Sequence, residues 1–202
     1  MDTEDFQTYW SARYAEGRTG WDMGAPAPPL RDYLDQLTDK DLRILLPGAG
    51  NAHEAEYAWQ RGFRNVFVLD IAAQPLENLR ARVPDFPADQ LIQGNFFEHT
   101  GQYDRILEQT FFCSFEPSPE TRAAYARRMY DLLAPGGKLV GLWFDFPLDR
   151  SGNRPYGGSR AEYLTYFAPY FTVEVLARAH NSIPPRAGRE LFGIFRRKER
   201  EW

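Results

Sequence analysis

The chain alternates between short apolar runs and stretches in which apolar residues recur at helical spacing. Five of the apolar runs end in turn residues, as buried strands do. The predicted strands are Leu42–Leu46, Val66–Leu69, Leu91–Gln93, Tyr103–Glu108 and Lys138–Phe144. The predicted helices between them are Ala52–Gln60, Gln74–Arg82 and Pro119–Leu133, the last stopped by a Pro-Gly-Gly turn. This alternation indicates parallel strands joined by crossover helices.

Both ends of the chain depart from the alternation. Phe6–Tyr14 predicts a helix, and the following "GRTGWDMGAPAPPL" is too rich in Gly and Pro to stay regular. After the fifth strand, "DFPLDRSGNRPYGGSR" predicts a long functional loop, and Ala161–Phe167 predicts a helix. The last two strand-like runs, Phe171–Ala177 and Leu191–Arg196, have no crossover helix between them, so they predict an antiparallel pair.

Five parallel strands followed by such a pair are the layout of the class I methyltransferases. We therefore predict an α/β fold with a three-layer, Rossmann-like, seven-stranded sheet whose last strand is antiparallel. The chain has 202 residues, of which 43% are hydrophobic. Because domains hold roughly 100 to 200 residues, we expect a single domain over residues 1–202, and the size suits a monomer.

Composition narrows the possible partners. The formal charge is −4 and the 24 Lys and Arg residues are dispersed, so no basic stripe is available for nucleic acid. The single cysteine, Cys113, cannot form an internal disulfide, and its apolar neighbours predict a buried, inert thiol. The N-terminus does not resemble a secretory signal, and no apolar run approaches the roughly 20 residues of a membrane span. We expect a soluble, cytoplasmic protein.

The stretch "RILLPGAGNAHEAEYAWQRGFRNVFVLDIA" predicts a ligand-binding turn. Gly48 and Gly50 let the backbone turn tightly between a strand and a helix and approach a ligand. In a dinucleotide site a third glycine would follow, whereas His53 and then Glu54 stand here. A carboxylate would repel pyrophosphate but suits an amino group, such as that at the methionine end of S-adenosylmethionine (SAM).

Polar residues at two further strand ends extend this site. Asp70 closes the second strand, about 20 residues after the turn, where an acid can accept hydrogen bonds from both ribose hydroxyls. Asn95 and Phe96 follow the third strand, where an amide can bond an adenine edge and a ring can pack on its face. The alternatives are a nicotinamide or flavin cofactor, or plain scaffold in which Asp70 caps a helix and Asn95 and Phe96 are a turn residue and a core residue.

Four separated motifs stand in a familiar order: "YWSARYAEGRTGWDMGAPAPPL", "PGAGNAHE", "PETRAAYARRMYDLLAPGGKL" and "HNSIPPRAGRELF". Together they resemble the thiopurine S-methyltransferase family of class I SAM-dependent methyltransferases, and most closely its plant halide and thiol methyltransferase branch. The resemblance covers nearly the whole chain. It implies transfer of a methyl group from SAM, with S-adenosylhomocysteine as product, to a small thiol or thiopurine sulfur, or to selenium or halide.

The resemblance also implies residue roles, with residues 1–30 as a lid over the cofactor. Together with the residues argued above, the predicted SAM-binding set is Trp10, Tyr14, Trp21, Gly48, Gly50, Glu54, Asp70, Ile71, Asn95, Phe96 and Gln109. The predicted acceptor-side set is Phe112, Tyr156, Ser182 and Arg186. The chain departs from the family pattern in having Ala49 for a cysteine, Asn95 for an acid, and Glu108-Gln109 for an Asp-Arg or Asp-Tyr pair. No metal site is expected, because the three histidines lie far apart.

The sulfonium of SAM is already activated, so the protein must mainly hold a nucleophile in line with the methyl group and exclude water. An ionised sulfur needs no dedicated base, whereas a thiol needs its pKa lowered, which Arg154 or Arg186 could do. Two alternatives remain: a SAM-binding protein without methyl transfer, and a nicotinamide-dependent oxidoreductase, against which Glu54 argues. Turnover with a generic thiol distinguishes a methyltransferase from the binding protein.

Overall fold

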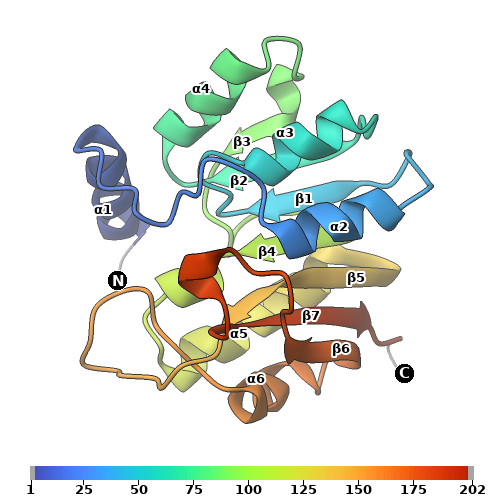
Figure 1. Ribbon diagram of the computed structural model, residues 1–202. Coiled ribbons are helices and arrows are strands. Elements are labelled where there is room, and N and C mark those ends of the chain that lie inside the picture. The colour runs from blue at the N-terminus through green and yellow to red at the C-terminus, as the bar shows by residue number, and fades with distance from the viewer. Residues whose placement is uncertain (1–2, 200–202) are drawn as a thin grey trace. The chain divides into compact units, whose positions relative to one another are not determined.

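A computed structural model describes residues 3–199 of the chain (Figure 1). The contacts divide the chain into two compact units, one ending at His99 and the other beginning at Thr100. The seven strands have the order β3-β2-β1-β4-β5-β7-β6. The predicted α/β class and strand number are therefore confirmed.

The first unit contains three parallel strands and four helices. Its elements are α1 (Thr3–Ala15), α2 (Pro28–Gln36), β1 (Ile44–Pro47), α3 (His53–Gln60), β2 (Val66–Asp70), α4 (Ala73–Arg82), the 3-10 turn η1 (Ala88–Gln90) and β3 (Leu91–Gln93). β2 pairs in parallel with β1 on one side and with β3 on the other. The carboxyl ends of the three strands therefore lie along one edge, where open α/β sheets bind ligands.

The turn from β1 into α3 is unusually tight. Gly48 and Gly50 have φ of 55° and 54°, and Ala52, which precedes α3, has φ of 55°. Glycine adopts this left-handed conformation at little cost, whereas alanine is strained in it. The backbone consequently reverses within a few residues of the end of β1 and leaves its amides close to the edge of the sheet.

The second unit contains the remaining four strands and two helices. Its elements are β4 (Tyr103–Gln109), η2 (Phe112–Ser114), α5 (Pro119–Leu132), β5 (Leu133–Phe144), α6 (Arg160–Phe167), β6 (Phe171–Arg178), η3 (Pro184–Arg186) and β7 (Glu190–Arg197). β4 and β5 are parallel, whereas β7 is antiparallel to both β5 and β6. The last strand is thus antiparallel, as predicted. Aromatic rings fill the core, with Trp143, Phe167 and Phe195 in mutual edge or tilted contact.

Three sequence-based boundaries were wrong. The segment predicted to be irregular up to Leu30 becomes helical at Pro28, where α2 begins. Proline is tolerated there because an amide in the first helical turn has no hydrogen-bond partner within the helix. β1 begins at Ile44, two residues later than predicted. β5 begins at Leu133, and its register jumps at Lys138, so the Pro-Gly-Gly turn forms an irregularity within the strand.

Within residues 3–199, no helix has the length and apolar character needed to cross a bilayer.

Candidate active site

Asp70 is the central polar residue at the carboxyl edge of the first unit. One carboxylate oxygen accepts a hydrogen bond from the Gly50 amide at 3.0 Å, and the other accepts one from the Ala72 amide at 2.9 Å. The residue is only 7% exposed, and burial raises the pKa of its carboxyl to about 6, although the amide bonds oppose this shift. Asp70 therefore fastens the glycine turn and the Ala72 amide just before α4, and its oxygens retain lone pairs for hydroxyl donors.

Three aromatic residues near the N-terminus, Trp10, Tyr14 and Trp21, form a cluster that we call the aromatic lid. Trp21 lies edge-on to Trp10 and Tyr14, at centroid distances of 5.3 and 5.5 Å. A Cβ atom placed on Gly50 would lie 3.0 Å from the Tyr14 hydroxyl and 3.4 Å from the indole nitrogen of Trp21. Burial and the nearby Asp70 charge raise the pKa of Tyr14. Tyr14 and Trp21 of the aromatic lid therefore pack directly on the glycine turn, and the role of the three residues over a cofactor stays a prediction.

Two acidic residues fasten the segment that follows the aromatic lid. The Asp22 carboxylate contacts His53 Nε2 at 2.7 Å and accepts hydrogen bonds from the Asn51 amide group and the Gly24 backbone. Burial of Asp22 raises its pKa, but these hydrogen bonds outweigh that effect and hold the pKa below its usual value. Glu54, 4% exposed, accepts a hydrogen bond from the Ala27 amide at 2.8 Å. Glu54 therefore has a structural contact with this segment beside its predicted cofactor role.

The predicted adenine-side residues lie past the end of β3. The Asn95 side-chain oxygen accepts a hydrogen bond from the Phe97 amide at 3.0 Å, and its amide group donates to Thr3 at 3.1 Å. Phe96 is buried, with its ring 5.2 Å from that of Phe97. These contacts are those of a turn asparagine beside a core phenylalanine, so the adenine role stays a prediction. Ile71 directly follows Asp70 and is half-buried.

The residues of the first unit fit SAM. The buried carboxylate of Asp70 at the end of β2 has no ion-pair partner among residues 3–199, and its hydrogen bonds come from backbone amides, which leaves lone pairs for a ribose diol. The glycine turn lacks the side chains that would keep a ligand from the backbone. Aromatic faces favour a sulfonium cation, and the aromatic lid supplies them beside the turn.

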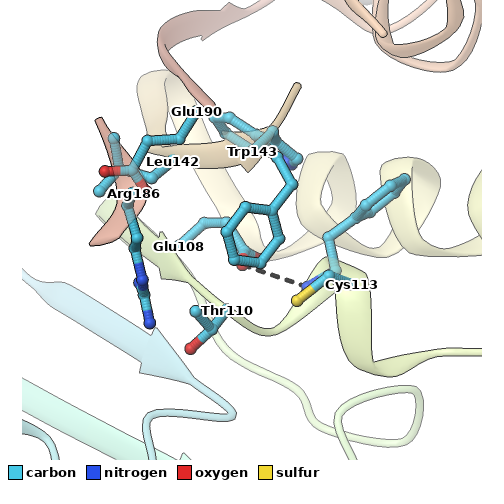
Figure 2. Close-up of a pocket in the computed structure, with 9 residues that line it drawn as sticks. Glu108, Thr110, Cys113, Leu142, Trp143, Arg186 and Glu190 are labelled. Carbon is cyan, nitrogen blue, oxygen red and sulfur yellow. Dashed lines mark hydrogen bonds between the residues drawn. The ribbon is translucent and has the colours of Figure 1, made fainter. Parts of the chain in front are cut away.

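The second unit contains a small pocket at the carboxyl ends of β4 and β5 (Figure 2). It is lined by Glu108, Thr110, Phe112, Cys113, Leu142, Trp143, Phe144, Arg186 and Glu190. Two of the predicted acceptor-side residues, Phe112 and Arg186, are therefore in its wall. Tyr156 is tied to this region by its amide, which donates to the Cys113 carbonyl at 3.0 Å. Burial raises the pKa of Glu190, while the hydroxyl of Ser182 and the charge of Arg186 oppose that rise.

Glu108 is the most deeply buried acid of the pocket, with no exposed surface. One of its carboxylate oxygens accepts hydrogen bonds from the amides of Phe111 and Phe112, at 2.8 and 3.1 Å. The other accepts a hydrogen bond from the Tyr125 hydroxyl. Burial outweighs these three bonds and raises the pKa of Glu108 to about 7. A carboxyl group with such a perturbed pKa in a pocket is typical of a functional site.

Four lining residues of the pocket were not predicted as site residues: Glu108, Thr110, Trp143 and Glu190. Two signals pointed to Glu108: it is an acid at the end of the apolar run "YDRILEQT", and it stands where the resembled family has the aspartate of an Asp-Arg or Asp-Tyr pair. Gln109 is the last residue of β4, as predicted. Cys113 is buried, as predicted, and burial with the nearby Glu108 charge raises the pKa of its thiol to about 12, which disfavours the reactive thiolate.

Comparisons with known proteins point to one enzyme family. Residues 5–202 match the family model described as thiopurine S-methyltransferase. A probable thiol methyltransferase 2 from Arabidopsis thaliana is 32% identical over 93% of this chain and 84% of its own. Thiocyanate methyltransferase 1 from Brassica oleracea is 29% identical over the same shares, 93% and 84%.

Solved structures agree in fold. A 1,6-didemethyltoxoflavin-N1-methyltransferase from Burkholderia thailandensis, with bound S-adenosylhomocysteine, has a TM-score of 0.75 at 19% identity and covers 96% of this chain and 87% of its own. A TehB-like SAM-dependent methyltransferase from Corynebacterium glutamicum has a TM-score of 0.64 at 15% identity, over 97% and 98% of the two chains.

The fold is that of the class I SAM-dependent methyltransferases. Within that class, the chain belongs to the thiopurine S-methyltransferase family. The predicted fold class, family, enzyme class and cofactor are thereby confirmed.

Proposed function

We propose that this protein transfers the methyl group of SAM to the sulfur of a small thiol-type acceptor. The observation that carries the proposal is the family match over residues 5–202, joined by relatives named as thiol and thiocyanate methyltransferases. Small selenium compounds and halides form the neighbouring acceptor classes, because they too are soft, polarisable nucleophiles. A single domain, a monomeric state and a cytoplasmic location stay predictions from the sequence.

The first unit would hold the cofactor. Asp70 would accept hydrogen bonds from the ribose hydroxyls, while the turn at Gly48 and Gly50 would lie against the ligand. Glu54, together with Gln109 of the second unit, is proposed for the methionine side, and Asn95, Phe96 and Ile71 are proposed for the adenine side. The aromatic lid would cover the site and exclude water. Bound SAM supplies a methyl group already activated by a positive sulfonium.

The second-unit pocket is proposed for the acceptor. Its walls are mainly apolar, and Arg186 contributes a positive charge that favours an ionised sulfur. Trp143 contributes an indole N–H that is buried without a hydrogen-bond partner among the described residues. Phe112, Tyr156 and Ser182 would complete the acceptor side. Such a pocket strips water from a soft anion and fixes its direction of approach, which is the main task that methyl transfer leaves to the protein.

Calorimetric titration with SAM, S-adenosylhomocysteine and NAD tests the cofactor half. We expect both adenosyl ligands to bind and NAD to give no heat. Asp70→Asn should weaken binding by about 10- to 100-fold, because a hydrogen bond to a charged group contributes roughly 1.5–3 kcal/mol. Asp89→Asn, an exposed acid of the same unit, serves as the matched control and should bind like the wild type. Absence of binding to correctly folded wild-type protein would exclude the methyltransferase.

Turnover with a panel of acceptors tests the second half. A small alkyl thiol, thiocyanate, iodide and selenide are each supplied with SAM, and formation of S-adenosylhomocysteine is measured. We expect turnover with the thiol. Tight SAM binding without turnover on any acceptor would instead indicate a cofactor-binding protein that does not transfer methyl.

A further inference from the structure

Glu108 occupies a place in the pocket that structural stabilisation alone does not explain. It is the penultimate residue of β4, it is fully buried, and it lies beside Cys113 and Trp143 in the pocket wall (Figure 2). No ion pair of residues 3–199 includes it. A carboxylate buried without a cation is costly to keep ionised, so such groups are rare outside functional sites.

The backbone next to Glu108 is arranged to hold this carboxyl. Thr110 has φ of 53°, in the left-handed region that β-branched residues strongly disfavour. The chain reverses there, and the amides of Phe111 and Phe112 come back to the Glu108 carboxylate. Strained backbone that persists in a pocket points to a function for the group it positions.

Both protonation states of Glu108 can be accommodated. A tyrosine hydroxyl donates and accepts, so Tyr125 can donate to the carboxylate and accept from the neutral acid. The titratable and charged groups that face Glu108 come from several elements: Tyr125 of α5, Cys113 of η2, Arg186 of η3 and Glu190 of β7. Burial dominates over these groups, and with the pKa of Glu108 near 7 the group exchanges protons readily at neutral pH.

We propose that Glu108 is the general base that ionises a neutral thiol held in this pocket. The inference rests on the proposed function. The S–H bond breaks, the proton goes to a carboxylate oxygen of Glu108, and the electron pair stays on the acceptor sulfur, near Arg186. That thiolate forms the new bond to the methyl carbon as the bond between methyl and sulfonium breaks, with its electron pair retained by the donor sulfur. Glu108 then releases its proton to solvent.

This role makes a prediction about substrate class. A base helps only acceptors that arrive with a proton, namely thiols and hydrogen sulfide. Thiocyanate and iodide are anions without a proton at neutral pH, so their methylation needs no base. Comparing the two kinds of acceptor therefore distinguishes proton transfer from every other function of the pocket, because only the protonated acceptors need the base.

The test compares Glu108→Gln with the wild type on a small alkyl thiol and on thiocyanate. The variant must rely on the thiol already ionised in solution, about 3% at pH 7 for a thiol pKa of roughly 8.5. We expect kcat/KM for the thiol to fall about 30-fold, while the value for thiocyanate stays within about threefold. The rise of thiol kcat/KM with pH should move from about pH 7 in the wild type to about 8.5 in the variant. Glu116→Gln, an exposed acid of the same unit, is the matched control.

A second readout needs no cofactor. Carbon-13 NMR of glutamate-labelled protein follows the Glu108 carboxyl directly, its resonance identified by its loss in Glu108→Gln, and should show titration near pH 7. If that variant does not fold, Tyr125→Phe replaces it. Loss of the hydroxyl donor should raise the pKa of Glu108 and move the thiol pH profile upward, again with thiocyanate little affected.

The outcomes separate two failures. An equal loss of kcat/KM for thiol and thiocyanate in Glu108→Gln, with an unchanged pH profile, would show that Glu108 only shapes the pocket. That result would overturn its proposed role as a general base. A carboxyl that titrates at the ordinary glutamate value would overturn it as well. A wild-type protein that binds SAM but methylates no acceptor would instead overturn the proposed function.

Discussion

The raised pKa of Glu108 has a consequence for stability that can be measured without any substrate. An ordinary glutamate titrates near 4.5, and the buried group titrates at about 7. Between these values the unfolded chain releases its proton while the folded protein keeps it, so rising pH lowers the free energy of unfolding. At 1.36 kcal/mol per pH unit, this loss amounts to about 3 kcal/mol by pH 8. Below about pH 4.5 the full stability is present.

Glu108→Gln removes this dependence while it keeps the shape of the neutral acid. The glutamine oxygen can accept from the amides of Phe111 and Phe112, and its NH2 group can donate to the Tyr125 hydroxyl. Relative to the wild type, the variant should therefore gain stability as pH rises, by about 3 kcal/mol between pH 4.5 and pH 8. In a chain of this length, that corresponds to a melting temperature roughly 6–12 °C higher.

Denaturant unfolding followed by tryptophan fluorescence measures this difference, since Trp143 is buried in the same unit. Wild type, Glu108→Gln and the exposed control Glu116→Gln are compared at intervals from pH 5 to pH 8.5. A stability difference that stays constant with pH would contradict the raised pKa, because it would show that folding leaves the pKa of Glu108 near its ordinary value. The control should track the wild type throughout.

Three further predictions concern the scaffold. Gly24→Ala, at φ of 67° with open space around it, should lower the free energy of unfolding by about 1–2 kcal/mol through backbone strain. Gly50→Ala should lower it more and should also weaken SAM binding, because the added Cβ meets the aromatic lid. Equal losses of the two variants in thermal unfolding would argue against that contact. Arg122→Ala should lower the free energy of unfolding in denaturant by about 3–5 kcal/mol, because its buried guanidinium donates to Glu162 and to the Gly157 carbonyl. As a control, Arg127→Ala, an exposed position on the same helix, should change it by less than about 0.5 kcal/mol. Ser118→Ala should cost about 1 kcal/mol by removing the cap of α5, and an unchanged unfolding midpoint would contradict the capping role.

Much of the fold could be predicted because its signals are local. Runs such as Val66–Leu69 and Leu91–Gln93 consist largely of branched apolar residues and are followed by turn residues. The predicted ends of both runs lie within one residue of the ends of the observed strands. The short connection before β7 indicated an antiparallel neighbour. α2 was missed because its prolines were counted as breakers, although proline in a first helical turn interrupts no hydrogen bond.

The first-unit site followed from the same kind of signal. Gly48, Gly50 and Asp70 stand at strand ends, and parallel strands bring such ends to one edge. The contacts of Glu54 with Ala27 and of Asp22 with His53 were not foreseen, because they join residues 27 and 31 positions apart in the chain. Which partner such a side chain meets depends on how the lid segment folds back, and no local pattern encodes that.

The α/β class, the succession of strands and helices, the family and the glycine turn after β1 could all be read from the chain alone, since they depend on periodicity and on short motifs. Only the tertiary structure decided that Glu108 is a buried acid in a pocket. The run that contains it is typical of a strand, and its carboxyl is placed by Tyr125, 17 residues away, and by the reversed backbone at Thr110. A carboxyl pKa depends on the water removed around it and the donors aimed at it, and both come from residues that meet only in the folded chain.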